Sequence, residues 1–74
     1  MNLKAIGKVL RQQREIKGLD YKQVARAAKV HANTVRGIES GNGDHCLMTF
    51  ESIGNVLGLS LLDIVRAGKG RSAA

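Results

Sequence analysis

The segment from Gly18 to Gly41, GLDYKQVARAAKVHANTVRGIESG, constrains the fold more than any other part of the chain. It predicts two short amphipathic helices, over about 21–28 and about 32–40, joined by a tight turn. Ala25 and Ala28 share the apolar face of the first of these helices. Because alanine side chains are small, the second helix can cross the first at close range. We therefore expect the chain to fold around this crossed pair.

Helical periodicity continues through the rest of the chain and predicts an all-α, compact five-helix bundle. The first helix is expected over 3–17, and its stripe consists of Leu3, Ile6, Val9, Leu10, Gln13 and Ile16. The fourth helix begins either near Cys46 or at Thr49, and its apolar face consists of Leu47, Phe50, Ile53 and Leu57. The fifth helix is expected from 61 to about Arg66. No segment of useful length alternates with the two-residue period of a strand, so no sheet is expected.

Helix-terminal signals support these boundaries. Asp20 with Gln23, and Ser60 with Asp63, have the spacing of a capping box, in which a side chain and a backbone N–H bond reciprocally. His31 precedes the helix over 32–40 and is a poorer cap than Ser or Thr. Glycines follow four helix-like segments, where a left-handed residue is expected. These glycines are Gly18, Gly41, Gly58 and Gly68.

The composition favours a nucleic-acid partner. The chain has 74 residues, with twelve Lys and Arg against six Asp and Glu, for a net charge of +6. A chain this short holds one domain, expected over 1–67, followed by a disordered basic tail over 68–74. A basic excess on so small a domain is typical of proteins that bind a polyanion. One Phe and one Tyr are too few for a base-stacking RNA surface, so double-stranded DNA is the predicted partner.

Other chemistries find little support. Cys46 is the single cysteine, so no disulfide framework is expected, and no apolar run approaches the roughly 20 residues of a membrane span. We expect a soluble, cytoplasmic protein with no membrane partner. His45 and Cys46 supply only two adjacent metal ligands, so no metal or cofactor is expected. No nucleophile arrangement, phosphate-binding glycine loop or effector site is evident, and the chain is not expected to be an enzyme.

The helix over 32–40 carries Val35 and Ile38 on one face and polar residues on the other. The candidates for base readout on that polar side are Ala32, Asn33, Thr34, Arg36 and Gly37. Because Asn pairs with adenine and Arg with guanine through two hydrogen bonds, Asn33 and Arg36 are expected to be the chief readers. For both residues, the alternative to base readout is a polar face that is only solvated. For Gly37, close backbone approach to DNA and simple tolerance of glycine on an exposed face stay equally open.

Phosphate contacts are expected around the same two helices. The candidates are Arg14, Tyr21, Lys22, His31, Ser40 and Asn42. Tyr21 and Lys22 lie at a helix N-terminus, where backbone amides and the helix dipole favour anions. Tyr21 is equally compatible with an aromatic residue at the edge of the core.

The order and spacing of these segments resemble the lambda-repressor-like, Cro-type helix-turn-helix domains of the Xre family. IGKVLRQQREIKGLDYKQVA is similar to the first two helices of that family, VHANTVRGIESG to its recognition helix, and FESIGNVLGLSLLDIV to its last two helices. The resemblance covers about residues 6–65. It implies that the helix over 32–40 enters the major groove while the helix over 21–28 lies across the groove entrance. It also implies an ion pair between Arg14 and Glu39.

Four positions depart from the pattern of the family. Lys29 stands where the family usually has Gly, so that residue is either strained at positive φ, at a cost of about 1 kcal/mol, or the turn is reshaped. Tyr21 replaces a frequent Gln, His31 replaces the usual Ser or Thr cap, and His45 replaces the usual Pro. These departures bear on detailed contacts more than on the fold.

The function predicted first is a sequence-specific transcriptional regulator, a repressor that binds a palindromic operator as a dimer. One recognition helix contacts few base pairs, and domains of this type usually bind as two-fold dimers. The predicted dimer surface consists of Leu61, Leu62 and Val65, because the fifth helix is apolar nearly all round. The alternatives are a restriction-modification-type controller and a toxin-binding antitoxin whose DNA binding is autoregulatory. A protein-interaction module without DNA binding is a third.

Overall fold

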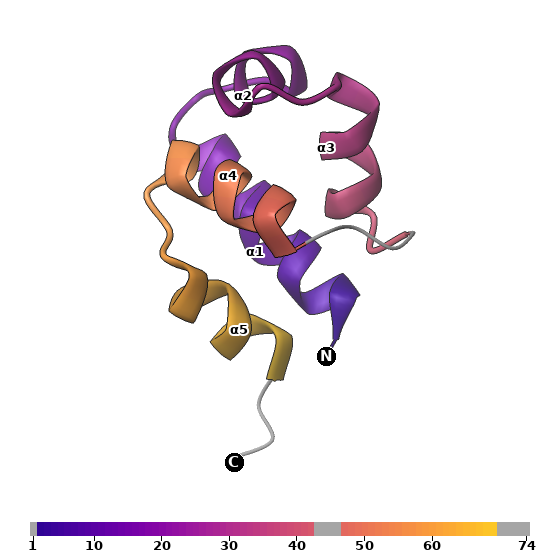
Figure 1. The fold of residues 1–74 in the computed structure, drawn as a ribbon, viewed down its shortest axis with the longest axis vertical. Coiled ribbons are helices and arrows are strands. Elements are labelled where there is room, and N and C mark those ends of the chain that lie inside the picture. The colour runs from indigo at the N-terminus through magenta and orange to yellow at the C-terminus, as the bar shows by residue number, and fades with distance from the viewer. Residues whose placement is uncertain (1, 43–46, 70–74) are drawn as a thin grey trace.

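The computed structural model describes residues 2–42 and 47–69, which form five α-helices (Figure 1). They are α1 (Leu3–Ile16), α2 (Tyr21–Ala28), α3 (Ala32–Glu39), α4 (Leu47–Leu57) and α5 (Leu61–Lys69). No strand occurs within these two described ranges. The predicted all-α five-helix architecture is therefore confirmed. The start of α4 at Leu47 agrees with the first of the two alternatives, although Cys46 itself lies outside the described residues.

The core lies at the centre of the five helices, and each helix contributes to it. α1 contacts α3, α4 and α5, while α2 packs against both α3 and α4. The buried hydrophobic residues are Ile6, Leu10, Val24, Ala25, Val35, Ile38, Phe50, Ile53, Leu57 and Ile64. Burial of these side chains is the main favourable term that holds α2 and α3 on the other three helices.

Local capping determines where the helices begin. The Asp20 carboxylate accepts a hydrogen bond from the Gln23 amide at 2.8 Å, and the Gln23 side chain accepts one from the Asp20 amide at 2.8 Å. The Ser60 hydroxyl accepts from the Asp63 amide at 3.1 Å, and the Asp63 carboxylate accepts from the Ser60 amide at 2.9 Å. Both predicted capping boxes are present. The Asn2 side chain also caps α1, a role that the sequence analysis did not assign.

The C-terminal ends of α1, α2, α3 and α4 share a left-handed residue, and after α2 this residue is Lys29 and not a glycine. Gly18, Gly41 and Gly58 have φ of 70°, 76° and 79°, as predicted, and Lys29 has φ of 61°. The Val30 amide donates to Ala25 O at 2.9 Å and the Lys29 amide to Arg26 O at 3.3 Å. The same two-bond pattern closes α1, α3 and α4. The turn after α2 is therefore not reshaped, and Lys29 adopts the strained left-handed conformation.

The predicted stripe of α1 is wrong at its C-terminal end. Ile16 is 77% exposed, whereas Arg14 is buried. Residues spaced four apart along a helix share a face, so the inward row runs from Ile6 through Leu10 to Arg14. The buried ion pair that Arg14 makes, described below, explains why a charged residue and not Ile16 occupies the end of this row.

The C-terminal helix is longer than predicted, and Gly68 does not end it. α5 continues to Lys69, beyond its expected end at about Arg66, and it includes residues 68 and 69 of the expected tail. Gly68 is buried within α5 and its carbonyl oxygen accepts a hydrogen bond of 2.6 Å from the Asn2 amide. This contact ties the end of α5 to the start of α1. Residues 70–74, the rest of the predicted tail, lie outside the described residues.

Candidate DNA-binding surface

α2 and α3 form a helix-turn-helix unit whose inner face is fixed by the core. Val24 and Ala25 of α2 and Val35 and Ile38 of α3 are all buried. The small Ala25 side chain permits the close crossing that the sequence predicts. These buried residues thereby orient the outer face of α3 away from the bundle.

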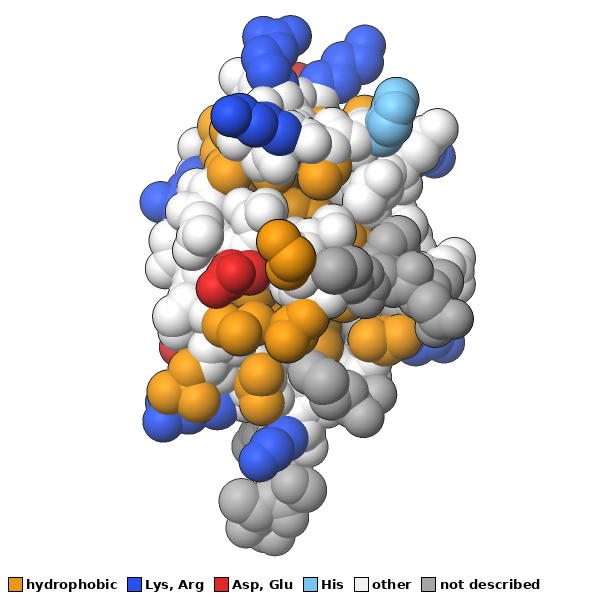
Figure 2. Space-filling view, in the orientation of Figure 1, with side chains coloured by type: hydrophobic (Ala, Val, Ile, Leu, Met, Phe, Trp, Pro, Cys, Tyr) orange, Lys and Arg blue, Asp and Glu red, His pale blue; other side chains and the backbone are white. Residues whose placement is uncertain are grey.

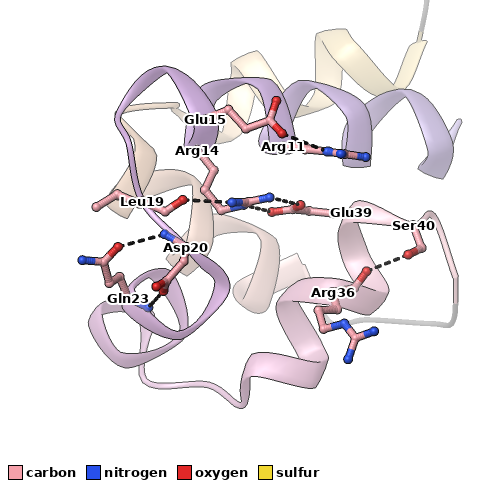
Figure 3. Close-up of polar contacts among 9 residues, drawn as sticks. All are labelled: Arg11, Arg14, Glu15, Leu19, Asp20, Gln23, Arg36, Glu39 and Ser40. Carbon is pink, nitrogen blue, oxygen red and sulfur yellow. Dashed lines mark hydrogen bonds and ion pairs between the residues drawn. The ribbon is translucent and has the colours of Figure 1, made fainter.

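A buried ion pair fixes the end of α3 to α1. The Arg14 Nε donates to Glu39 Oε2 at 2.7 Å and its Nη2 to Glu39 Oε1 at 3.1 Å, while Nη1 donates to Leu19 O at 2.9 Å (Figure 3). The two side chains are 11% and 5% exposed. The hydrogen bonds that Arg14 donates to Glu39 raise the pKa of Arg14 above its ordinary value, so the guanidinium stays charged. The Arg14–Glu39 ion pair that the family resemblance implied is present. It engages the guanidinium of Arg14, which was also a predicted phosphate contact.

The predicted base-reading residues lie on the outer face of α3. Asn33 and Arg36 are exposed, whereas Ala32, Thr34 and Gly37 are half-buried. The Arg36 side chain points away from the Arg14–Glu39 pair (Figure 3). Within the described part of the chain, the Arg36 guanidinium makes no hydrogen bond or ion pair. Its five N–H donors are therefore available to an external acceptor.

A hollow of about 430 Å³ opens beside Arg36, between the N-terminal turns of α2 and α3. The residues that line it are Tyr21, Lys22, Ala32, Asn33 and Arg36. The structure thus brings together residues of the base-reading and phosphate-contacting sets that are distant in sequence. Among the lining residues, Ala32 and Tyr21 offer apolar surface, and Lys22, Asn33 and Arg36 offer polar or charged groups. This combination suits the edge of a base pair.

Tyr21 lies close to two guanidinium groups. The Cζ of Arg14 is 4.4 Å from the centroid of the Tyr21 ring, and the Cζ of Arg36 is 5.9 Å from it. Both distances are within the range of cation–π attraction. The side chain is half-buried and packs against the core, in agreement with the expectation of an aromatic residue at the core edge. The contact with Arg36 was not predictable from local sequence patterns, because fifteen positions separate the two residues.

The remaining phosphate candidates differ in their availability. Lys22 and His31 are exposed, and His31 caps α3 without a side-chain hydrogen bond, as expected for a poor cap. The Ser40 hydroxyl donates to the Arg36 carbonyl oxygen at 2.8 Å (Figure 3), which leaves only its lone pairs outward. Asn42 is exposed, and its amide donates to Gly37 O at 3.0 Å. Lys and Arg side chains also gather around α2, at the top of Figure 2.

Gly7 is a positioning residue that the sequence analysis missed. A Cβ built there would lie 2.4 Å from Ile38 O and 2.6 Å from Glu39 O. The backbone of α1 therefore touches the C-terminal end of α3 directly, next to the Arg14–Glu39 pair. A glycine on the inward face of a helix, one residue after the core residue Ile6, is the signal that could have revealed this contact.

No group of three or more metal-ligating side chains occurs in residues 2–42 and 47–69, and the predicted absence of a His45–Cys46 metal site concerns residues outside them. No single helix in these ranges is long and apolar enough to cross a membrane. Only α4 and α5 taken together reach that length and composition, with a bend of 110° between them.

Comparison with known proteins agrees with this geometry. A family profile described as "Helix-turn-helix domain" matches residues 5–67. The chain belongs to this family. The fold is also similar to the crystal structure of the clp gene regulator ClgR from Corynebacterium glutamicum, with a TM-score of 0.83 and 26% sequence identity over 99% of this chain and 78% of that chain. No curated protein matches the chain by sequence.

Family and fold together confirm the resemblance drawn from the sequence. The chain is a helix-turn-helix DNA-binding transcription regulator and not an enzyme. The matched segment, residues 5–67, spans all five helices except the first two residues of α1 and the last two of α5. The α2–α3 unit is thus embedded in a domain whose fold is similar to that of the ClgR structure.

Proposed function

We propose that the chain is a sequence-specific repressor that binds a palindromic operator as a homodimer in the bacterial cytoplasm, at the nucleoid. One observation carries the proposal above the others. Asn33 and Arg36 are exposed on the outer face of α3 while Val35 and Ile38 of the same helix are buried in the core. A helix held by one face and polar on the other can enter a major groove without rearrangement.

The roles of the individual residues follow from their positions. Asn33 and Arg36 read base edges, with Ala32, Thr34 and Gly37 at the groove surface. Lys22, at the exposed N-terminal turn of α2, contacts a phosphate, as do His31, Ser40 and Asn42. Arg14 supports the surface from inside, because its guanidinium is already bound to Glu39 and Leu19.

Selection of bound sites from random duplexes tests the proposal. We expect one enriched half-site, repeated in inverted orientation about one helical turn apart. The Arg36→Ala variant should lose discrimination at particular base pairs, by about 1–3 kcal/mol per lost bidentate contact. Arg26→Ala, a matched change at an exposed arginine of α2, should keep the preference of the wild type. Enrichment of no sequence would refute sequence-specific function.

Phosphate contacts are tested by salt. Lys22→Ala should weaken binding evenly across sequences and reduce the slope of log affinity against log salt by about one. A loss confined to particular base pairs would instead make Lys22 a base reader.

Repression is the simplest regulatory outcome for this surface, because a bound dimer blocks a promoter by occupying it. Transcription in vitro from a promoter that contains the selected site should fall as protein is added. A rise in transcription would assign the chain to the activating, controller-type alternative.

The proposed dimer uses α5 and the adjacent end of α4. Leu62 is 56% exposed, Leu47 and Met48 of α4 are also exposed, and Leu61 and Val65 are half-buried. Figure 2 shows hydrophobic side chains together on the face where α4 and α5 lie. Large exposed apolar side chains gathered on one face are typical of a protein–protein contact.

The oligomeric state tests this face directly. Leu62→Lys should reduce the sedimentation mass to that of a monomer and weaken operator binding. Ile16→Lys places the same charge on the exposed end of α1 and should change neither quantity. An unchanged mass for Leu62→Lys would refute the assignment of the dimer to α5.

A further inference from the structure

The ring of Tyr21 lies near two arginines, the hydrogen-bonded Arg14 and the exposed Arg36. Arg14 is immobilised by three hydrogen bonds and lies 4.4 Å from the ring centroid. Arg36, 5.9 Å from the same ring, has no other polar contact in the described part of the chain. The two guanidinium groups therefore differ in what holds them: hydrogen bonds hold Arg14, and only the aromatic ring holds Arg36.

Tyr21 itself is held in place. It is the first residue of α2, directly after the Asp20–Gln23 capping box, and its side chain packs against the core. An aromatic side chain has few rotamers, and the groups that Tyr21 contacts, Arg14 and the core residues, are buried. It can thus act as a rigid platform at the rim of the hollow that it shares with Arg36.

We propose that Tyr21 is the positioning residue of Arg36 and thereby sets specificity at the base pair that Arg36 reads. The inference rests on the proposed function, in which Arg36 contacts a base. A free arginine side chain samples many rotamers, and ordering it on binding costs conformational entropy. A guanidinium already attracted to the Tyr21 ring loses less of that entropy, and it reaches one base pair from one direction. The attraction that holds it falls in the range of exposed cation–π contacts.

This role differs from the phosphate contact considered for Tyr21 from the sequence. A positioning role needs the aromatic ring and not the hydroxyl, whereas a phosphate contact needs the hydroxyl as a donor. The two roles also differ in their target, since positioning changes discrimination at one base pair and a phosphate contact changes affinity for every sequence.

The experiment compares Tyr21→Phe and Tyr21→Leu on the selected operator and on duplexes altered at the base pair that Arg36→Ala identifies. Tyr21→Leu should lose about 5-fold in discrimination at that base pair, the fold-change of a cation–π contact of ordinary strength, with non-specific affinity within error of wild type. Its thermal midpoint should fall, because the contact of the ring with Arg14 is lost as well. Tyr21→Phe should restore the discrimination. In the Arg36→Ala background, Tyr21→Leu should cause no further loss.

Three results would overturn the proposal. An even loss of affinity in Tyr21→Phe across all duplexes would make the hydroxyl a phosphate ligand. An equal loss from Tyr21→Leu with and without Arg36 would make the ring merely structural. Unchanged discrimination in Tyr21→Leu would show that Arg36 needs no platform.

A spectroscopic measurement tests the contact apart from DNA binding. Tyr21 is the single tyrosine and the chain has no tryptophan, so tyrosine emission reports on this ring alone. Arg36→Ala should change the emission of the free protein, and Arg26→Ala should leave it unchanged. If the wild type selects no DNA sequence but Arg36→Ala changes the emission, the proposed function fails while the contact stands. If the emission does not respond to Arg36→Ala, the positioning role fails whatever the wild type binds.

Discussion

Replacement of Glu39 by Gln is expected to lower the stability of this small domain by more than any surface substitution. The Glu39 carboxylate is 5% exposed and accepts two hydrogen bonds from Arg14, at 2.7 and 3.1 Å. The amide of Gln accepts one of these bonds and turns its NH₂ group toward the other guanidinium N–H. A hydrogen bond to a charged group contributes about 1.5–3 kcal/mol, and removal of one partner from a buried pair costs about 3–5 kcal/mol. We therefore expect a loss of about 3 kcal/mol.

The chain contains its own matched control. Arg11 and Glu15 form a second arginine–carboxylate pair, at 3.2 Å, but their side chains are 61% and 54% exposed. An exposed pair at this spacing contributes about 0.3–0.5 kcal/mol. Glu15→Gln makes the same chemical change on the surface of α1 and should cost no more than that.

Urea unfolding followed by far-UV circular dichroism measures both variants. With an m-value of about 1 kcal/mol/M for a small domain, Glu39→Gln should lower the midpoint by about 3 M, and Glu15→Gln by less than about 0.5 M. At about 1 M salt, the effect of Glu15→Gln should vanish and that of Glu39→Gln should persist, because buried pairs are screened much less. Equal losses in the two variants would refute the argument that burial makes the Arg14–Glu39 pair strong.

Three further changes test other parts of the fold. Lys29→Gly should raise the stability by about 1 kcal/mol in thermal melts, because it relieves a φ of 61°, and Lys29→Ala should give no gain because alanine keeps the strain. Gly7→Ala should lower the stability by about 1–2 kcal/mol, because overpacking against the α3 backbone exceeds the gain of about 1 kcal/mol in helix propensity; a more stable variant would contradict this contact. Hydrogen bonds from the Ser60 amide and hydroxyl lower the pKa of Asp63 below 3.8, so its contribution is complete above that pH and is lost as the pH falls through the lowered pKa. Asp63→Asn should therefore flatten the acid limb of a stability–pH curve, and an unchanged limb would remove Ser60 as the cause.

The elements that the sequence predicted correctly are those fixed by neighbours within about four residues. The capping boxes at Asp20 and Ser60 and the left-handed glycines at Gly18, Gly41 and Gly58 formed as expected, because each depends on local backbone hydrogen bonds. The outer face of α3 was also predictable, since helical periodicity alone separates Asn33 and Arg36 from the buried residues.

The errors fall where a distant segment decides the outcome. The sequence pattern predicts Ile16 as a core residue, but Ile16 is exposed. Arg14, paired with Glu39, occupies the inward row of α1 instead. Gly68 reads as a helix end and is buried within α5, because the start of α1 bonds to its carbonyl oxygen. Neither partner is visible from the pattern around the residue itself.

The amino-acid order by itself determined five helices, their caps, a basic character and the polar side of α3, because all of these follow from local geometry and net charge. Only the tertiary structure decided that α1 touches α3 through Gly7, and that Tyr21 lies between Arg14 and Arg36 in the chain of contacts. The physical reason is the separation along the chain over which each kind of interaction acts. Caps and periodicity act over one helical turn, whereas the contacts around Tyr21 and Arg36 join residues that only the packing of separate helices brings together.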